Sequence, residues 1–345
     1  MMNEIIKEGK AELVIPKIWK ITKKLPVFYN PVMKFNRDIS VLLVNCIDKK
    51  DMQIGLPLSG SGIRGIRFAK ELHKGKIKSI NFNDFSENAF KSIKKNLKLN
   101  NVKGGKVVVC NKDANMFLLE SHGFDYIDID PFGSPNPFLN SSIVRLSRSG
   151  VLAITATDTA ALTGTYANAC KRKYWSVALK NELMHETGLR ILIKKIQLVG
   201  SQFDKALIPI FSYSKEHYFR VFFRCEKGKK KVDEVIKQHG LFNNAGPMWL
   251  GKLWDVKLCS LMEKMNDAEE NKKILQVIKD ESKIDVVGFY DVTRLAKKYK
   301  LKVLPKKEEL IKMIKFAGFK AAETHFRENS IRTDISEKEL VKILK

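Results

Sequence analysis

The sequence of 345 residues predicts an α/β fold, with a doubly wound, mostly parallel sheet and a smaller α+β C-terminal domain. Between residues 53 and 156, short apolar runs alternate with helical patterns, and the connections are short. This order is typical of a parallel sheet with helices on its faces. After about Gly200 the sequence pattern changes: it predicts longer strands first and then mostly helices. We therefore expect one domain over residues 1–200, with an N-terminal lid segment, and a second over 201–345.

Five strands are expected in the first domain, because five short apolar runs end at glycine, asparagine, cysteine or aspartate, or run into a new helix. They cover residues 54–58, 76–82, 106–110, 124–130 and 151–156. One helical pattern precedes them at 37–44, and others follow between them at 63–72 and 86–97, with further helices beginning at 113 and near 136. The segment 4–28 that leads into the domain contains prolines and is expected to be extended or turning.

The second domain is expected to open with strands at residues 207–211 and 217–224. Helical patterns follow at 257–263, 272–278, 292–298 and 307–317. A helix, a turn, a second helix and a short hairpin form the outline of a winged-helix-like module, which is our expectation for the end of the chain.

Charge is the strongest global signal in the sequence. Lys and Arg total 63 against 38 Asp and Glu, a formal net charge of +25. Such an excess destabilises a compact chain unless a polyanion neutralises it, which favours a nucleic-acid partner. A lysine-rich bias typical of thermophiles is the alternative explanation.

No apolar run is long enough to span a bilayer, and residues 1–10 do not resemble a targeting peptide. We therefore expect a cytoplasmic protein with no membrane association and no obligate protein partner. The five cysteines are scattered and form no C-x-x-C pair, so neither a disulfide framework nor a zinc site is expected.

Polar residues and glycines follow three successive strands of the predicted sheet. Gly60 and Gly62 let the backbone approach a ligand at the start of a helix. Asp84 stands about where an acid commonly binds a ribose. Asp113 and Ala114 follow the third strand and are suited to an adenine edge. The series predicts an adenosine-bearing ligand, while a simple strand-to-helix turn stays the alternative for the glycines alone.

Asp130, Pro131 and Phe132 end the fourth expected strand. The nitrogen lone pair of an exocyclic base amine is delocalised into the ring, so the amine is a poor nucleophile. Hydrogen bonds from it to the Asp130 carboxylate and the Pro131 carbonyl favour a pyramidal, reactive nitrogen. Phe132 can stack on the base, a contact of about 1–3 kcal/mol. These residues fit methyl transfer to a base amine, although acid-proline turns are also common without this role.

Several stretches resemble the tRNA (guanine-26-N2)-dimethyltransferase family, and the likeness covers nearly the full length. The stretches are Phe28–Pro31, Ser59–Ala69, Asn83–Ser86, Asp128–Pro135, Thr155–Ala160, His185–Arg190 and Gly246–Gly251. The resemblance implies a class I methyltransferase (Rossmann-like) fold that uses S-adenosyl-L-methionine and acts on the N2 of a guanine in tRNA. Relatives carry a cysteine cluster near residues 243–249 that this chain lacks, so no structural metal is expected.

The resemblance also implies roles for individual residues. The expected contacts to S-adenosyl-L-methionine are Arg37, Gly60, Gly62, Arg67, Asp84, Asp113 and Ala114. The Ile-Arg repeat of this motif leaves Arg64 as an alternative to Arg67. Asp130 is the expected catalytic acid, and Phe28, Pro131 and Phe132 are expected to hold the guanine ring.

Two other functions stay open on the sequence alone. An adenine-N6 methyltransferase would use the same acid-proline-aromatic chemistry. A non-catalytic RNA-binding protein could keep a methyltransferase fold, although the series Asp84, Asp113 and Asp130 argues against it.

Overall fold

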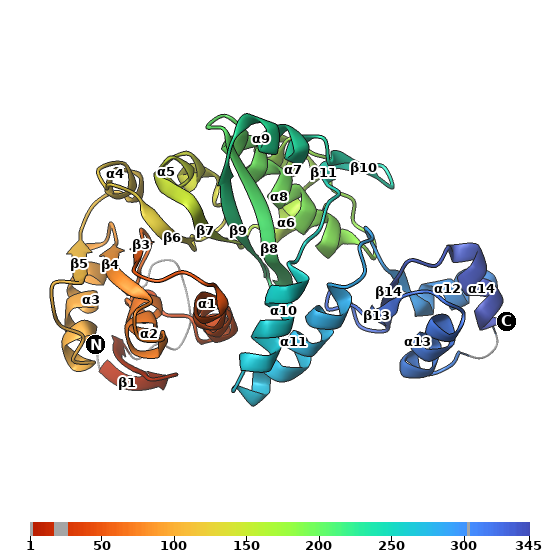
Figure 1. Ribbon diagram of the computed structural model, residues 1–345, viewed down its shortest axis with the longest axis horizontal. Helices are drawn as coiled ribbons and strands as arrows, with labels where there is room; N and C mark the ends of the chain where they lie inside the picture. The colour runs from red at the N-terminus through yellow and green to blue at the C-terminus, as the bar shows by residue number, and fades with distance from the viewer. Residues whose placement is uncertain (1–2, 17–26, 302–303) are drawn as a thin grey trace. The chain divides into compact units, whose positions relative to one another are not determined.

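The computed structural model describes residues 3–16, 27–301 and 304–345, and a seven-stranded sheet is its central element (Figure 1). The strand order is β5-β4-β3-β6-β7-β9-β8, and the neighbouring pairs from β5 to β7 are parallel. The strands span Met52–Leu56 (β3), Ile77–Asn83 (β4), Val107–Cys110 (β5), Phe124–Ile129 (β6), Leu146–Ala156 (β7), Lys205–Lys215 (β8) and Tyr218–Lys227 (β9). The predicted α/β class with a mostly parallel sheet is confirmed.

Helices cover both faces of the parallel part of the sheet. They are α1 (Lys34–Cys46), α2 (Ile63–Glu71), α3 (Glu87–Leu99), α4 (Ala114–Leu119) and α5 (Leu139–Arg145), with short 3-10 turns at Pro31–Met33 and Asn136–Phe138. Figure 1 shows α1, α2 and α3 on one side of these strands and α4 and α5 on the other. The five strands and the helices predicted for this region are confirmed, with shifts at their ends.

The N-terminal segment folds as a two-stranded antiparallel hairpin, β1 (Asn3–Glu8) and β2 (Ala11–Pro16). Ala11, Leu13 and Ile15 alternate along β2 and are buried, as expected for a strand with one face on a core. The two strands are extended, as predicted for this segment, but their pairing into a hairpin was not predicted. Residues 17–26 of the expected lid lie outside the described residues.

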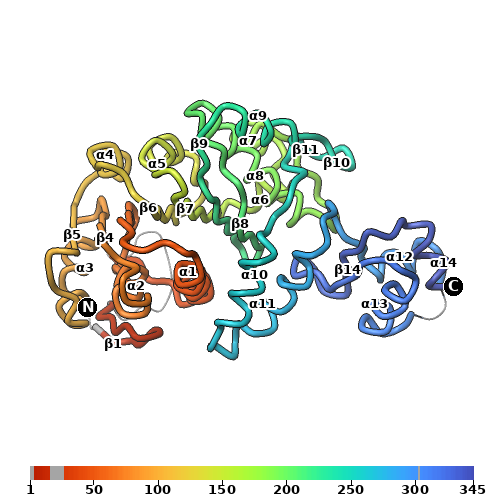
Figure 2. The backbone as a smooth tube through the Cα atoms, in the orientation of Figure 1, coloured from red at the N-terminus to blue at the C-terminus, as the bar shows by residue number. Residues whose placement is uncertain are grey.

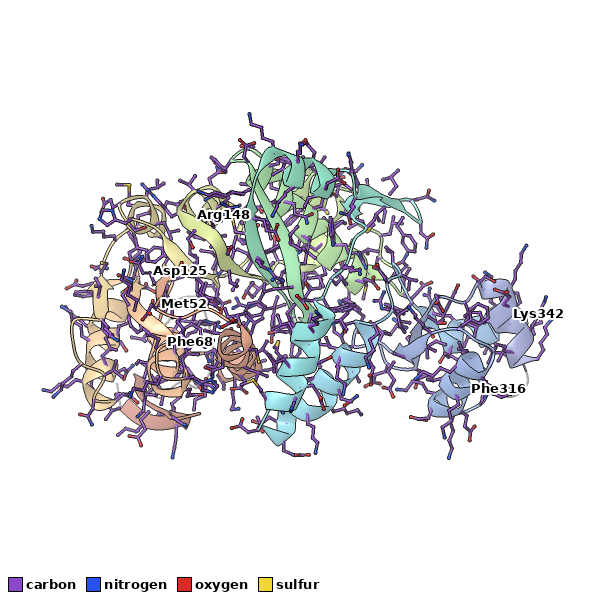
Figure 3. The ribbon with its side chains drawn as sticks, in the orientation of Figure 1. Met52, Phe68, Asp125, Arg148, Phe316 and Lys342 are labelled. Atoms are coloured by element: carbon purple, nitrogen blue, oxygen red, sulfur yellow. The ribbon has the colours of Figure 1, made fainter. Side chains whose placement is uncertain are left out.

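Local sequence explains where the helices of this region begin. The Ser86 side chain accepts a hydrogen bond from the Ala89 amide at the start of α3, and Asp113 accepts from two amides at the start of α4. The core between sheet and helices includes Phe68 of α2 and Tyr126 of β6, whose ring centroids lie 5.5 Å apart. Met52 of β3 is also fully buried (Figure 3).

Two compact units make up the chain. The first contains Met1–Thr157, Leu198–Ile208 and Phe222–Asp233, and the second contains the rest. The boundaries of these two units differ from the expected domain boundary at residue 200. The expected division into a methyltransferase domain and an RNA-binding domain stays a prediction. In particular, β8 and β9, which we assigned to the second domain, belong to the seven-stranded sheet and contribute residues to both units.

The second unit begins with three helices, α6 (Thr159–Leu162), α7 (Ala167–Tyr174) and α8 (Met184–Ser201), of which α8 ends in the first unit. Later elements are α9 (Lys229–Ile236), β10 (His239–Phe242), β11 (Ala245–Trp249), α10 (Val256–Met265) and α11 (Glu269–Glu281). Figure 2 traces the chain through these elements. Within the described part of the chain, no helix combines the length and apolarity needed to cross a membrane.

The end of the chain has the element order of a winged-helix module. It runs β12 (Tyr290–Asp291), α12 (Val292–Tyr299), α13 (Lys307–Phe316), β13 (Ala321–Glu323), β14 (Ser330–Thr333) and α14 (Glu337–Leu344). The three strands form an antiparallel sheet in the order β12-β14-β13. Leu295, Leu310, Ile331 and Leu340 join its core, while Phe316 is 97% exposed at the end of α13 (Figure 3).

A buried ionic network ties α8, α11 and β14 together within the second unit. Arg332 donates to Glu186 Oε2 at 2.7 Å and to Glu281 Oε1 at 2.9 Å. Arg190 donates to Glu186, and His325 Nδ1 lies 2.6 Å from Glu281 Oε2. Burial alone would raise the pKa of Glu186, but Arg332 and Arg190 hold it well below its ordinary value.

Candidate active site

A cavity of about 430 Å³ lies where the loops after β3, β4 and β6 meet. This is the carboxyl edge of the parallel strands, where open α/β sheets bind ligands, and the strand order changes direction at β3. The cavity lies entirely within the first unit. Seven of the predicted site residues line it: Phe28, Arg37, Gly60, Asp84, Asp130, Pro131 and Phe132.

The glycine loop after β3 forms a close backbone cradle. Gly60 has φ +54, and a Cβ added to it would meet the Phe28 carbonyl oxygen at 3.0 Å. Gly62 caps α2 in the left-handed region at φ 83. Gly65 lies one turn further along α2, where a Cβ would lie only 2.2 Å from the Phe82 ring. Gly65 therefore allows close packing of helix on sheet, the task of the third glycine in dinucleotide loops.

Asp84 joins the first two strand ends. Its Oδ2 accepts a hydrogen bond from the Gly60 amide at 2.8 Å, and its Oδ1 accepts one from the Ser86 amide at 3.0 Å. Burial raises the pKa of Asp84 above its ordinary value, although the two amides oppose the shift. The carboxylate is thereby fixed at the cavity edge, in the position that suits a ribose.

Asp130 is positioned by an arginine of α2. Arg64 Nη2 donates to Asp130 Oδ2 at 2.5 Å, and Arg64 Nη1 donates to Ser40 Oγ at 2.7 Å. The Arg64 Nε lies 3.4 Å from Asp128 Oδ1, whose other oxygen accepts from the Tyr126 hydroxyl. Arg64 thus holds one oxygen of the Asp130 carboxylate, and Asp130 itself lines the cavity.

The turn after Asp130 is held by the end of β7. Gly133, at φ +87, donates its amide to Thr157 Oγ1 at 2.7 Å, and its carbonyl accepts from the Thr157 amide at 3.0 Å. Both backbone groups of Gly133 are therefore satisfied by one residue. This clamp fixes the backbone two residues after Pro131.

Two aromatic rings face each other at the cavity. The centroids of Phe28 and Phe132 are 4.3 Å apart in an edge-to-face arrangement. A stacked base occupies about 3.4 Å along a stack, so two rings that sandwich one base must lie about 6.8 Å apart. The observed arrangement therefore leaves no room for a base between the two rings, and their expected contact with a guanine stays a prediction.

The arginines differ from expectation. Arg67 does not line the cavity, because its guanidinium is buried against Glu8, Asp38 and Glu71. Arg64, the alternative offered by the Ile-Arg repeat, does line the cavity, and the contact of either arginine with the donor stays a prediction. Arg37 lines the cavity, but its Nε and Nη2 both donate to Glu8.

Three further predicted residues lie outside the cavity lining. Gly62 shapes the loop as a helix cap. Asp113 is exposed and caps α4, and Ala114 is buried at the first position of that helix. Both follow β5, which is two strands away from β3. Their expected contact with an adenine stays a prediction.

The sequence reasoning missed Glu8, Ser40 and Thr157, which support the site from distant segments. Burial alone would raise the pKa of Glu8, but the hydrogen bond and charge of Arg37, with the charge of Arg67, lower it. Burial and the neighbouring Glu8 raise the pKa of Tyr29 to about 12. The alternation of apolar and polar residues along β2 is the one sequence signal for the hairpin that carries Glu8. No cluster of metal-binding side chains occurs among the residues that the structure describes.

Comparison with known proteins places the chain in a family. The family model described as N2,N2-dimethylguanosine tRNA methyltransferase matches residues 9–244 and 239–345. The chain belongs to this family. The resemblance deduced from the sequence motifs is confirmed.

Individual members of the family are similar over almost their whole length. A tRNA (guanine(26)-N(2)/guanine(27)-N(2))-dimethyltransferase of Aquifex aeolicus is 39% identical, over 98% of this chain and 95% of that protein. The tRNA (guanine(26)-N(2))-dimethyltransferase of Methanocaldococcus jannaschii is 37% identical, over 99% and 98%. The solved structure of Trm1 from Pyrococcus horikoshii with S-adenosyl-L-methionine superposes with a TM-score of 0.90 at 35% identity, covering 99% of both chains.

Proposed function

We propose that the protein is a tRNA methyltransferase that transfers methyl groups from S-adenosyl-L-methionine to the exocyclic N2 of guanine 26. The observation that carries the proposal is one cavity that combines the Gly60 loop, Asp84 and the Asp130-Pro131-Phe132 turn. It occurs in a chain that aligns over 99% of its length with a family member bound to that donor.

The cavity suits a cationic adenosine-bearing donor. Asp84, Asp128 and Asp130 line it against Arg37 and Arg64, and Arg37 is already paired with Glu8. The net charge of the remaining lining side chains is negative, which favours binding of a positively charged sulfonium. When bound, S-adenosyl-L-methionine supplies an activated methyl group, so no nucleophilic side chain is required. The Gly60 cradle and Asp84 would hold it, and Asp113 and Ala114 are proposed for its adenine.

Asp130 and Pro131 would orient the guanine amine. The Asp130 carboxylate and the Pro131 carbonyl could each accept one N–H of N2, which would direct the nitrogen lone pair toward the methyl group. As the N–C bond forms, the S–CH3 bond of the donor would break and leave the neutral thioether; N2 would then be cationic and lose a proton, for which the Asp130 carboxylate would be the acceptor. Arg64 keeps the carboxylate in place while this occurs. Most of the acceleration would come from this positioning.

Phe28 and Phe132 would hold the base. A guanine inside tRNA must be turned out of its stack, which requires a few kcal/mol. Stacking on an aromatic ring stabilises the turned-out base by about 1–3 kcal/mol. Because the two rings contact each other, separation of the pair is part of base entry.

The net charge of +25 supports tRNA as the partner, since a chain of this charge binds a polyanion in a salt-dependent way. We propose that residues 1–200 carry the chemistry and that residues 201–345 contribute most of the RNA contacts. The winged-helix order of the last elements agrees with this division.

The test is incubation of an unmodified tRNA transcript with labelled S-adenosyl-L-methionine, followed by mass analysis of the nucleosides. A transcript with guanine at position 26 should yield N2-methylguanosine and N2,N2-dimethylguanosine. A transcript with adenine at that position should yield no methylated product from it. Appearance of N6-methyladenosine instead would contradict the proposal.

A further inference from the structure

Trp175, directly after α7, has a backbone conformation that is unfavourable for a large side chain. Its φ of 54 and ψ of 44 lie in the left-handed region. Of the ten non-glycine residues with positive φ in the described part of the chain, Trp175 is the one aromatic residue. Bulky residues are rare in this region, and such outliers concentrate at functional sites.

Neighbouring side chains hold this conformation. The buried Lys194 donates its Nζ to the carbonyl oxygens of Tyr174 at 3.1 Å and of Trp175 at 3.0 Å. The Tyr174 hydroxyl donates to Asp158 at 2.7 Å. The backbone at the end of α7 is thus held from both sides.

The indole ring is presented to solvent instead of being packed. Trp175 is 52% exposed, whereas Trp249 and Trp254 in the same unit are buried. The ammonium of Lys195 lies 3.0 Å from the centroid of the Trp175 ring, a cation–π contact that covers one face. Figure 2 shows α8, which carries Lys195, close to α7. Half of the residue stays exposed although Lys195 lies over the ring.

Further cations precede Trp175 in the last turn of α7. Lys171 and Arg172 in the last turn of α7 are exposed and make no ion pair with any described residue. Lys173 is paired with Asp158 at 3.4 Å. An aromatic face beside unpaired cations is the arrangement with which proteins bind unstacked bases and their phosphates.

We propose that Trp175 is a stacking platform for an unpaired base of the tRNA substrate, with Lys171 and Arg172 contacting the adjoining phosphates. This inference rests on the proposed function, because it names a contact surface for that substrate. The chemistry recognised is a flat base without a partner strand, such as those in tRNA loops and at stem junctions.

The variant Trp175→Gly separates a binding role from a structural one. Glycine adopts the left-handed conformation without strain, so the thermal midpoint should stay at or near the wild-type value. The Kd for tRNA should rise about fivefold or more, whereas kcat at saturating tRNA should not change. Trp175→Tyr, which keeps a ring, should restore binding to within about twofold of wild type.

Asn101→Gly is the matched control. Asn101 follows the end of α3 in the same left-handed region, at φ 54, but carries neither an aromatic ring nor a charge. This variant relieves the same backbone strain and should bind tRNA like the wild type. In the double variant Lys171→Ala, Arg172→Ala, the slope of log Kd against log salt should fall by about two.

Wild-type affinity in Trp175→Gly, in a chain that methylates tRNA normally, would overturn the platform and leave the proposed function intact. If the weaker tRNA binding of Trp175→Gly is accompanied by a lower thermal midpoint, Trp175 has a structural role in packing, and the proposed platform is also overturned. Failure of the wild type to bind or methylate tRNA would remove both the proposed function and the platform.

Discussion

The Nη2 of Arg64 lies 2.5 Å from Oδ2 of Asp130, and this pair determines which carboxylate oxygen is available to a substrate. The same guanidinium binds Ser40 of α1 and lies beside Asp128 of β6. One planar side chain thus joins a helix before the sheet to two positions at the end of β6. An arginine fork can hold three such partners at once, which a point charge cannot.

Arg64→Lys should lower the rate of methyl transfer while leaving tRNA affinity close to wild type. Lysine keeps the charge but cannot hold Ser40 and the Asp130 carboxylate together, so the acceptor oxygen shifts. A misplacement of about 1 Å can reduce the rate by about 100-fold, and we expect at least a tenfold fall in kcat. Single-turnover assays measure this change.

Arg148→Lys on the exposed part of β7 is the control for the same exchange and should retain full activity (Figure 3). Equal rates for Arg64→Lys and wild type would show that the ion pair does not position Asp130.

Gly65→Ala should destabilise the first unit. The new Cβ would lie 2.2 Å from the Phe82 ring and 2.6 Å from a Leu56 methyl, so α2 must move away from the sheet. Overpacking of this kind costs about 1–3 kcal/mol. Gly105→Ala, where a Cβ meets nothing within 4 Å, is the matched control and should leave the melting temperature unchanged. Identical thermal midpoints for the two variants would contradict the close packing.

Sequence patterns were sufficient for the parallel part of the sheet and for the seven predicted site residues that line the cavity, because these depend on local signals. The ends of β3, β4 and β6 are marked by Gly60, Asp84 and Asp130, and topology alone brings such strand ends together. The choice between Arg64 and Arg67 was not accessible, since both lie on the buried face of one helix.

Partners from distant segments decide between the two arginines. Ser40 lies 24 residues before Arg64, and Glu8 lies 59 residues before Arg67. No local pattern specifies such pairs. The place of β8 and β9 in the main sheet was missed for the same reason, because strand pairing across a long connection leaves no periodic signal.

Glu8→Gln should lower stability at neutral pH and have a smaller effect in acid. The pKa of Glu8 is below its ordinary value in the folded protein, so its contribution is complete above the unfolded pKa of 4.5 and is lost as pH falls through the folded pKa. Removing the charge leaves Arg37 and Arg67 buried without it. Breaking such a pair costs about 3–5 kcal/mol.

Thermal midpoints at pH 7 and pH 4 test this dependence. The gap between Glu8→Gln and wild type should narrow at the lower pH. The exposed pair of Glu87 and Lys91 provides the control, and Glu87→Gln should show no measurable change at either pH. A gap that widens in acid would reverse the assigned sign.

Arg332→Leu should unfold the second unit more easily by about 3–5 kcal/mol, because Glu186 and Glu281 would remain buried without their main partner. Arg294→Leu removes an exposed arginine that pairs with Glu182 and should cost less than about 1 kcal/mol. Denaturant titration followed by tryptophan fluorescence compares the two variants. Similar midpoints would show that the network contributes little to stability.

The account depends most on Asp130 as the acceptor for the guanine amine. The direct test is single-turnover methylation of a tRNA transcript by Asp130→Ala and Asp130→Asn, with the Kd for S-adenosyl-L-methionine measured on the same preparations. We predict a fall in the methyl-transfer rate of about 100-fold or more, with donor affinity close to wild type. A near-normal rate in Asp130→Ala, with the donor bound, would contradict the assigned role.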